Sequence, residues 1–78
     1  MLVLYVREHC PFCEVVVEAG RKLGVEFDVV LDIGDSVVRS ELIMRGGKAQ
    51  VPYFRDTERG VEMYESADIV RYLKEMRR

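Results

Sequence analysis

The stretch from Leu2 to Cys13 decides the fold, and it reads LVLYVREHCPFC. Its first part, Leu2–Val6, is a continuous apolar run that ends at charged residues, which predicts a buried strand. Pro11 is preset for the first turn of a helix, so we expect a helix from about Pro11 to Leu23. The apolar side chains that recur at helical spacing within it are Phe12, Val15, Val16, Ala19 and Leu23. Cys10 and Cys13 therefore lie where a strand gives way to a helix, a placement typical of redox chemistry.

Cys10 is predicted at the N-cap of this helix, because Pro11 occupies the first helical position. Its sulfur would face unpaired backbone N–H groups and the positive end of the helix dipole, and both favour the thiolate over the thiol. Cys13 follows one turn later on the same side, close enough to attack a mixed disulfide formed on Cys10. The pair thus predicts a nucleophile, Cys10, and a resolving thiol, Cys13.

Two other interpretations of the cysteine pair are zinc binding and a purely structural disulfide. Zinc takes about four ligands, whereas the chain has two cysteines and one histidine, His9, so a full site would need distant carboxylates or a second chain. A disulfide across so few residues would remove little entropy from the unfolded chain. Both interpretations are weaker than the redox one, and we expect no metal site and an exposed loop position for His9.

Composition sets further limits on the function. The 78 residues allow one core, so we expect a single domain over residues 1–78, and 49% hydrophobic with 33% charged residues is ordinary for a soluble globule. A net charge of -2 with interspersed acids and bases argues against nucleic acid as a partner. The N-terminal apolar run is too short for a signal peptide or a membrane span. We therefore expect a cytoplasmic protein with no membrane partner, where two cysteines are better explained by catalysis than by structure.

The rest of the chain predicts five more strands and helices in a regular order. A strand is predicted at Val25–Leu31, followed by a loop at Asp32–Asp35. Ser36 would cap a helix that runs to about Arg45, with Val38, Leu42 and Ile43 facing inward. Two hairpin arms, at Pro52–Phe54 and Val61–Tyr64, flank a loop at Arg55–Gly60, and Ser66 would cap a last helix. The order β-α-β-α-β-β-α predicts an α/β fold with a parallel first pair of strands, an antiparallel hairpin and helices on both faces. The cysteine motif would lie at the carboxyl end of the first strand, where open α/β sheets present functional groups.

Three motifs carry a resemblance to a known family. They are REHCPFC at 7–13, QVPYF at 50–54 and YESADIVRYL at 64–73, and together they resemble a glutaredoxin over nearly the whole chain. More narrowly, the last motif resembles the glutathione-binding N-terminal domain shared by glutathione transferases and transferase-like, two-domain glutaredoxins. The resemblance implies a thioredoxin-like fold of the glutaredoxin type, with a four-stranded mixed sheet.

The same resemblance implies a glutathione site. The Val51–Pro52 peptide bond would be cis, although the residues alone favour trans, and the Val51 backbone would pair with glutathione as with an added strand. Glu65 would take the ammonium group of the ligand, and the hydroxyl and N–H of Ser66 its γ-glutamyl carboxylate. Arg7 would hold the thiolate ionised or meet a ligand carboxylate.

One departure concerns the glycyl carboxylate of glutathione. Relatives often carry a basic or amide side chain two or three residues before the Val-Pro pair, where this chain has Ala49 and Lys48. Lys48 could still reach the ligand, and Gln50 is polar, so the source of this contact stays open.

The predicted function is a dithiol thiol-disulfide oxidoreductase with glutathione as co-substrate and no tightly bound cofactor. We expect a monomer that acts on disulfide-bearing proteins or glutathione mixed disulfides. One alternative is a glutathione-independent electron donor that a thioredoxin reductase reduces, and another is an iron-sulfur cluster carrier as a glutathione-bridged dimer. Conjugation of glutathione to electrophiles is not expected, because the sequence shows no helical domain to form the electrophile pocket.

Overall fold

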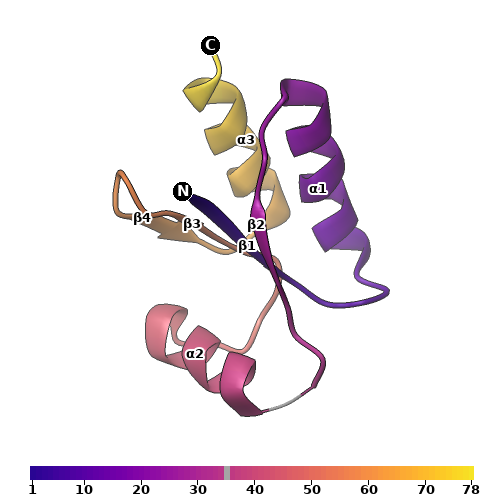
Figure 1. Cartoon of the computed structure of the whole chain (residues 1–78), viewed down its shortest axis with the longest axis vertical. Helices are drawn as coiled ribbons and strands as arrows, with labels where there is room; N and C mark the ends of the chain where they lie inside the picture. The colour runs from indigo at the N-terminus through magenta and orange to yellow at the C-terminus, as the bar shows by residue number, and fades with distance from the viewer. Residues whose placement is uncertain (35) are drawn as a thin grey trace.

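The structure is a computed structural model that describes residues 1–34 and 36–78. Its elements are β1 (Leu2–Val6), α1 (Pro11–Leu23), β2 (Asp28–Leu31), α2 (Ser36–Gly46), β3 (Tyr53–Asp56), β4 (Val61–Met63) and α3 (Ser66–Met76), as Figure 1 shows. The predicted element order is confirmed. The predicted loop after β2 ends at Asp35, which lies outside the described residues. None of the helices in the described ranges is long and apolar enough to cross a membrane.

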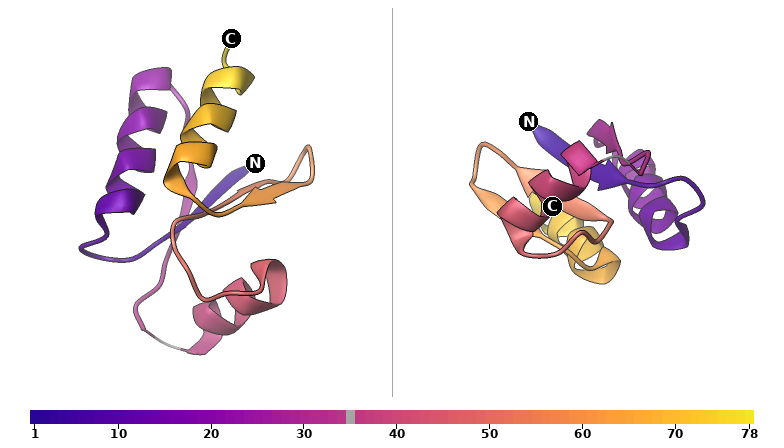
Figure 2. Two further views of the ribbon diagram at one scale, coloured as in Figure 1. Left: turned by 180° about the vertical axis from the view of Figure 1, so that it is seen from behind. Right: turned by 90° about the horizontal axis from the view of Figure 1, so that it is seen from below.

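The sheet has the strand order β2-β1-β3-β4. Strand β1 runs parallel to β2 and antiparallel to β3, and β3 pairs antiparallel with β4. Helices α1 and α3 lie side by side on one face, and α2 lies on the other (Figures 1 and 2). This is the mixed, four-stranded sheet that the resemblance to glutaredoxins implies.

The core has two parts because side chains alternate between the faces of a strand. Toward α1 and α3 the sheet presents Leu4 and Phe54, which pack with Val16, Ile69 and Leu73. Toward α2 it presents Val3, Tyr5 and Tyr53, which pack with Leu42. Tyr53 is only 1% exposed and is a core residue.

The second strand starts later than predicted, at Asp28 rather than Val25. The reason is the end of α1, where Gly24 adopts the left-handed conformation and the N–H of Val25 donates to the Gly20 carbonyl at 2.8 Å. The Val25 donor is therefore used by the helix end and not by the sheet. Phe27 then turns inward against Gly20, where a Cβ atom would overlap its ring.

Two predictions about side-chain burial need correction. On α1, Val16 is buried, but Phe12 and Val15 are 66% and 51% exposed, so the predicted apolar stripe is wider than the face that meets the sheet. On α2, Leu42 is buried while Ile43 is exposed, which makes its predicted inward position wrong. Neighbouring residues point about 100° apart around a helix, so α2 can direct only one of these two at the sheet.

The hairpin also differs from its prediction, since β3 continues through Arg55 and Asp56, which were predicted in the loop. Both pair in register with β4. Asp56 is almost fully buried, and its carboxylate accepts hydrogen bonds from the Tyr72 hydroxyl at 2.6 Å and from Arg59 at 3.0 Å. One partner from the adjacent turn and one from α3 therefore let a charged residue continue the strand.

Candidate functional site

The two cysteines lie at the start of α1. Cys10 is its N-cap, as predicted, with extended backbone angles, and its Sγ accepts a hydrogen bond from the N–H of Cys13 at 3.2 Å. The two residues form a disulfide, with their Cα atoms 5.2 Å apart. Cys13 is only 3% exposed, whereas Cys10 is half-buried. An incoming sulfur can therefore reach Cys10 more easily than Cys13.

The Val51–Pro52 peptide bond is cis. The cis bond confirms what the resemblance implies, whereas the residues alone favour a trans bond. Pro52 is buried and Val51 is half-buried, directly before the first residue of β3. The loop thus brings the Val51 backbone to the surface beside the sheet.

Helix α3 begins differently from its prediction. Its N-cap is Glu65, at a positive φ of 68° and with no side-chain cap hydrogen bond, and Ser66 is the first helical residue. The predicted Ser66 cap is therefore wrong. The Glu65 carbonyl accepts the first helical bond, from the N–H of Ile69 at 3.0 Å. Ser66 still contributes one of the backbone N–H groups that a helix start leaves without intrahelical partners.

A cavity of about 290 Å³ lies between these segments. Its lining comprises Phe12, Gln50, Val51, Pro52, Glu65 and Ser66. Four of these residues are the ones that the resemblance assigns to glutathione, and the fold brings them together from two loops far apart in the chain. We refer to this hollow as the Val51–Glu65 cavity.

Sequence reasoning did not assign Phe12 to the ligand site, and it named Gln50 only as a polar residue that could meet the glycyl carboxylate. Phe12 comes from inside the cysteine motif, so it joins the cavity to the redox pair, and its exposed ring forms one wall. The amide of Gln50 lies 3.5 Å from the Glu65 carboxylate. The signals for them were weak: an aromatic residue between the cysteines, and a polar one before Val51.

Lys48 is not among the residues that line the cavity. Its ammonium group lies 5.3 Å from the centroid of the Tyr64 ring, a favourable cation–π distance. Of Lys48 and Gln50, only Gln50 therefore lines the cavity, and its amide lies on the side of Glu65.

Arg7 lies outside this cavity, beside the other face of the cysteine pair. It lines a neighbouring hollow of about 350 Å³ together with Cys13. Its Nε donates to the Asp32 carboxylate at 2.7 Å and its Nη2 to the Ala49 carbonyl at 2.9 Å. Arg7 thus ties the loop after β2 to the loop that precedes Pro52. Its contact with ligand or thiolate stays a prediction.

Asp32 is the buried partner of Arg7, and its side chain has no exposed surface. The hydrogen bond from Arg7, and secondly that from the Gly34 N–H at 2.9 Å, hold the pKa of Asp32 below its ordinary value. A buried carboxylate needs such partners to stay ionised. The pair therefore fixes the loop geometry on this side of the motif.

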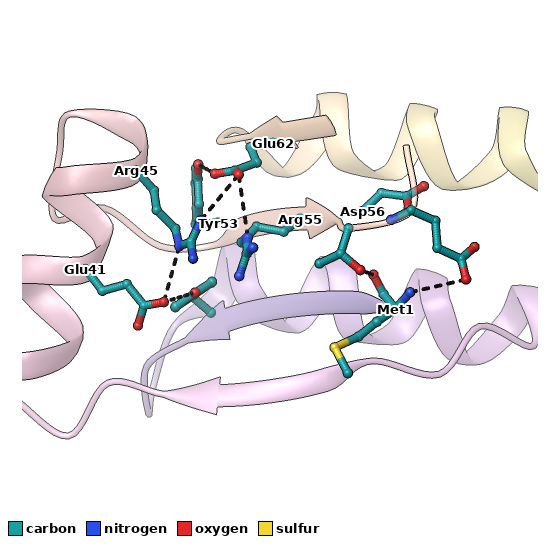
Figure 3. Close-up of polar contacts among 10 residues, drawn as sticks. Met1, Glu41, Arg45, Tyr53, Arg55, Asp56 and Glu62 are labelled. Atoms are coloured by element: carbon teal, nitrogen blue, oxygen red, sulfur yellow. Dashed lines mark hydrogen bonds and ion pairs between the residues drawn. The ribbon is translucent and has the colours of Figure 1, made fainter. Parts of the chain in front are cut away.

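A cluster of charged and tyrosine side chains joins α2 to the sheet, as Figure 3 shows. The Tyr5 hydroxyl donates to Glu41 at 2.7 Å, Arg45 contacts Glu41 and Glu62, and the Tyr53 hydroxyl donates to Glu62. Burial, and secondly the bond to Glu62, raise the pKa of Tyr53. Glu41 and Arg45 of α2 thus contact Tyr5 of β1 and Glu62 of β4, so the cluster stabilises the position of α2.

Comparison with known proteins places the chain in a family. A family model described as the glutathione S-transferase N-terminal domain matches residues 4–78. No curated protein matches the chain.

Solved structures give a consistent result. A glutathione S-transferase from the Antarctic clam Laternula elliptica superposes with a TM-score of 0.82 at 23% identity, over 96% of this chain and 34% of that one. A trimeric glutathione transferase from Leishmania gives a TM-score of 0.77 at 29% identity, over 92% of this chain and 16% of that one. Glutaredoxin 2 from Salmonella typhimurium, in complex with glutathione, gives a TM-score of 0.63 at 25% identity, over 94% of this chain and 32% of that one.

The chain therefore spans about a third or less of the length of each of these proteins. The thioredoxin-like fold is shared along almost all of this chain, and the family model covers it from the middle of β1 to the last residue. The chain belongs to the glutathione S-transferase N-terminal domain family.

Proposed function

We propose that the protein is a thiol-disulfide oxidoreductase that uses glutathione as its co-substrate. One observation carries the proposal: a cysteine pair at a helix start, with one accessible and one buried sulfur, lies beside a cavity built from the predicted glutathione residues. A reducing compartment such as the cytoplasm, where glutathione is kept reduced, is where this chemistry would run.

The reaction begins with the reduced protein. The Cys10 thiolate attacks one sulfur of a protein disulfide, or the protein sulfur or glutathione sulfur of a mixed disulfide, and the other sulfur leaves as a thiolate that takes up a proton. Cys13 then loses its proton and attacks the Cys10 sulfur, which releases the second thiol and leaves the Cys10–Cys13 disulfide. Two glutathione molecules supply the two electrons that restore the dithiol, and they leave as glutathione disulfide. The N–H of Cys13, 3.2 Å from the Cys10 sulfur, supports the thiolate.

Binding of glutathione in this proposal uses the Val51–Glu65 cavity. The Val51 backbone pairs with the cysteinyl part of the ligand beside Pro52, Glu65 takes the ammonium group, and Ser66 takes the γ-glutamyl carboxylate. Gln50 supplies a further donor beside Glu65, since its amide lies 3.5 Å from that carboxylate. Arg7 contributes its positive charge on the Cys13 side of the motif.

The test is reduction of a glutathionylated small thiol, coupled to glutathione and glutathione reductase. We expect Cys10→Ser to fall to the background rate and Cys13→Ser to stay active, because glutathione itself can resolve the mixed disulfide on Cys10. If the wild type is inactive but accepts electrons from a thioredoxin reductase, the redox function stands and the glutathione site falls. Conjugation of an electrophile that survives loss of both cysteines would instead indicate a transferase.

The ligand site has its own test. Ser66→Ala should raise the KM for glutathione, because it removes a donor from the predicted carboxylate position. Ser40→Ala is the matched control, since Ser40 is an exposed residue of α2. Equal effects of the two substitutions would contradict the assignment of Ser66.

A further inference from the structure

We propose that Tyr64 is a positioning residue that holds the two loops of the Val51–Glu65 cavity in place, through its hydroxyl group. The proposal rests on the glutathione-dependent function proposed above. Tyr64 is the first residue of the motif at 64–73, but the resemblance assigns it no role. Its position between the two loops indicates a role in addition to packing.

The cavity has two main walls that come from distant parts of the chain. One is residues 50–52 before β3, and the other is Glu65 and Ser66 at the start of α3. The side chains of Gln50 and Glu65 meet across the cavity only at 3.5 Å, the limit of a hydrogen bond. A closer link between the walls is provided one residue before Glu65.

That link is the hydroxyl of Tyr64. It donates to the Lys48 carbonyl at 2.7 Å and accepts from the Lys48 N–H at 3.1 Å. A tyrosine hydroxyl has one donor and can also accept, so it can serve both backbone groups of Lys48 at once, as a neighbouring strand would. Lys48 lies two residues before Gln50, so the contact sets where the first wall begins relative to the second.

Packing determines where the hydroxyl lies. The Tyr64 ring lies against the backbone of Gly46, where a Cβ atom would overlap both the ring and the hydroxyl. Its centroid is 4.6 Å from that of Tyr53, and the Lys48 ammonium lies on its face. The contacts with Tyr53 and with the Lys48 ammonium involve the ring, whereas the contact with Gly46 involves both the ring and the hydroxyl. Tyr64→Phe would therefore keep the ring contacts and remove the hydrogen bonds of the hydroxyl, namely those with Lys48 and a longer one, at 3.4 Å, to the Leu42 carbonyl.

Tyr72 offers a matched control. Its hydroxyl also makes one strong hydrogen bond across the fold, to Asp56 at 2.6 Å. Tyr72 lies on α3, and neither it nor Asp56 lines the cavity. Tyr72→Phe thus removes a comparable bond without touching the two loops.

The experiment uses the full, reduced chain labelled with ¹⁵N. Glutathione is titrated while the amide signals of Val51 and Ser66 are followed, and hydrogen exchange of the Lys48 amide is measured in the same samples. We expect Tyr64→Phe to weaken glutathione binding by about two- to tenfold, the usual effect of one hydrogen bond, and to accelerate exchange at Lys48. Tyr72→Phe should leave both unchanged. The rate at which Cys10 reacts with a small aromatic disulfide reagent should be the same in all three proteins.

The outcomes separate this inference from the proposed function. Wild-type affinity in Tyr64→Phe, or equal weakening in Tyr72→Phe, overturns the positioning role. If the wild type itself does not bind glutathione, the proposed function fails, and exchange then decides the role of Tyr64. Unchanged hydrogen exchange at Lys48 in Tyr64→Phe overturns the positioning role, and faster exchange supports Tyr64 as the link between the loops.

Discussion

Asp32→Asn should destabilise the protein through the loops on the Arg7 side of the cysteine motif. The carboxylate of Asp32 accepts from Arg7 Nε at 2.7 Å and from the Gly34 N–H at 2.9 Å, one bond on each oxygen. Asparagine has the same shape but only one oxygen, so it can accept from one of these donors and turns its NH₂ group toward the other. The variant therefore loses one hydrogen bond to a charged group and the ion pair with Arg7.

The size of this loss follows from the burial of the two partners. A hydrogen bond to a charged group contributes about 1.5–3 kcal/mol. The Asp32 side chain has no exposed surface, but that of Arg7 is 36% exposed, so water can solvate the released guanidinium in part. We therefore expect a loss near the lower limit, about 1.5–2 kcal/mol. For a domain of this size the melting temperature would fall by roughly 6–16 °C.

Urea unfolding followed by circular dichroism measures the effect, with Asp28→Asn as the control because Asp28 is exposed on β2. The arginine hydrogen bond, and secondly the Gly34 N–H, lower the pKa of Asp32 in the folded state. Its contribution is therefore present above the unfolded pKa, about 3.9, and is lost as the pH falls through the lower folded value. The difference in unfolding free energy between wild type and Asp32→Asn should thus become smaller in acid. The reasoning would be refuted if Asp32→Asn lost no more unfolding free energy than Asp28→Asn at pH 7. It would also be refuted if the difference from wild type grew toward about pH 3.

Two other predictions concern packing and a buried tyrosine. Gly20→Ala should lower the free energy of unfolding by about 1–2 kcal/mol, because the overlap with Phe27 outweighs the helix preference of alanine; urea unfolding measures this, and a more stable variant would contradict it. Tyr53→Phe should lose less stability than wild type between pH 8 and about pH 11. Burial first, and the bond to Glu62 second, raise the pKa of Tyr53, so unfolding releases its proton above the ordinary tyrosine pKa and favours the unfolded chain. Urea unfolding at both pH values tests this, and a constant difference between the two proteins would count against it.

Much of the fold follows from local patterns. The apolar run of β1 and the proline at the start of α1 predicted both elements with the bounds that the structure has, and with them the N-cap position of Cys10. These features depend on residues a few positions apart, where periodicity, turn preference and capping act directly. The resemblance of the motifs to glutaredoxins added the cis bond before Pro52, which no local preference indicates.

The tertiary structure alone decided how the site is completed. Arg7 and Asp32 are 25 positions apart, and Lys48 and Tyr64 are 16 apart, yet each pair fixes a loop at the site. The inclusion of Gln50 in the cavity and the exposure of Phe12 likewise depend on how the loops pack. The sequence by itself determined the strand, the helix and the place of the cysteine pair between them, because these need only neighbours along the chain. Polar contacts between distant loops depend on the relative positions of packed elements, which only the folded chain defines.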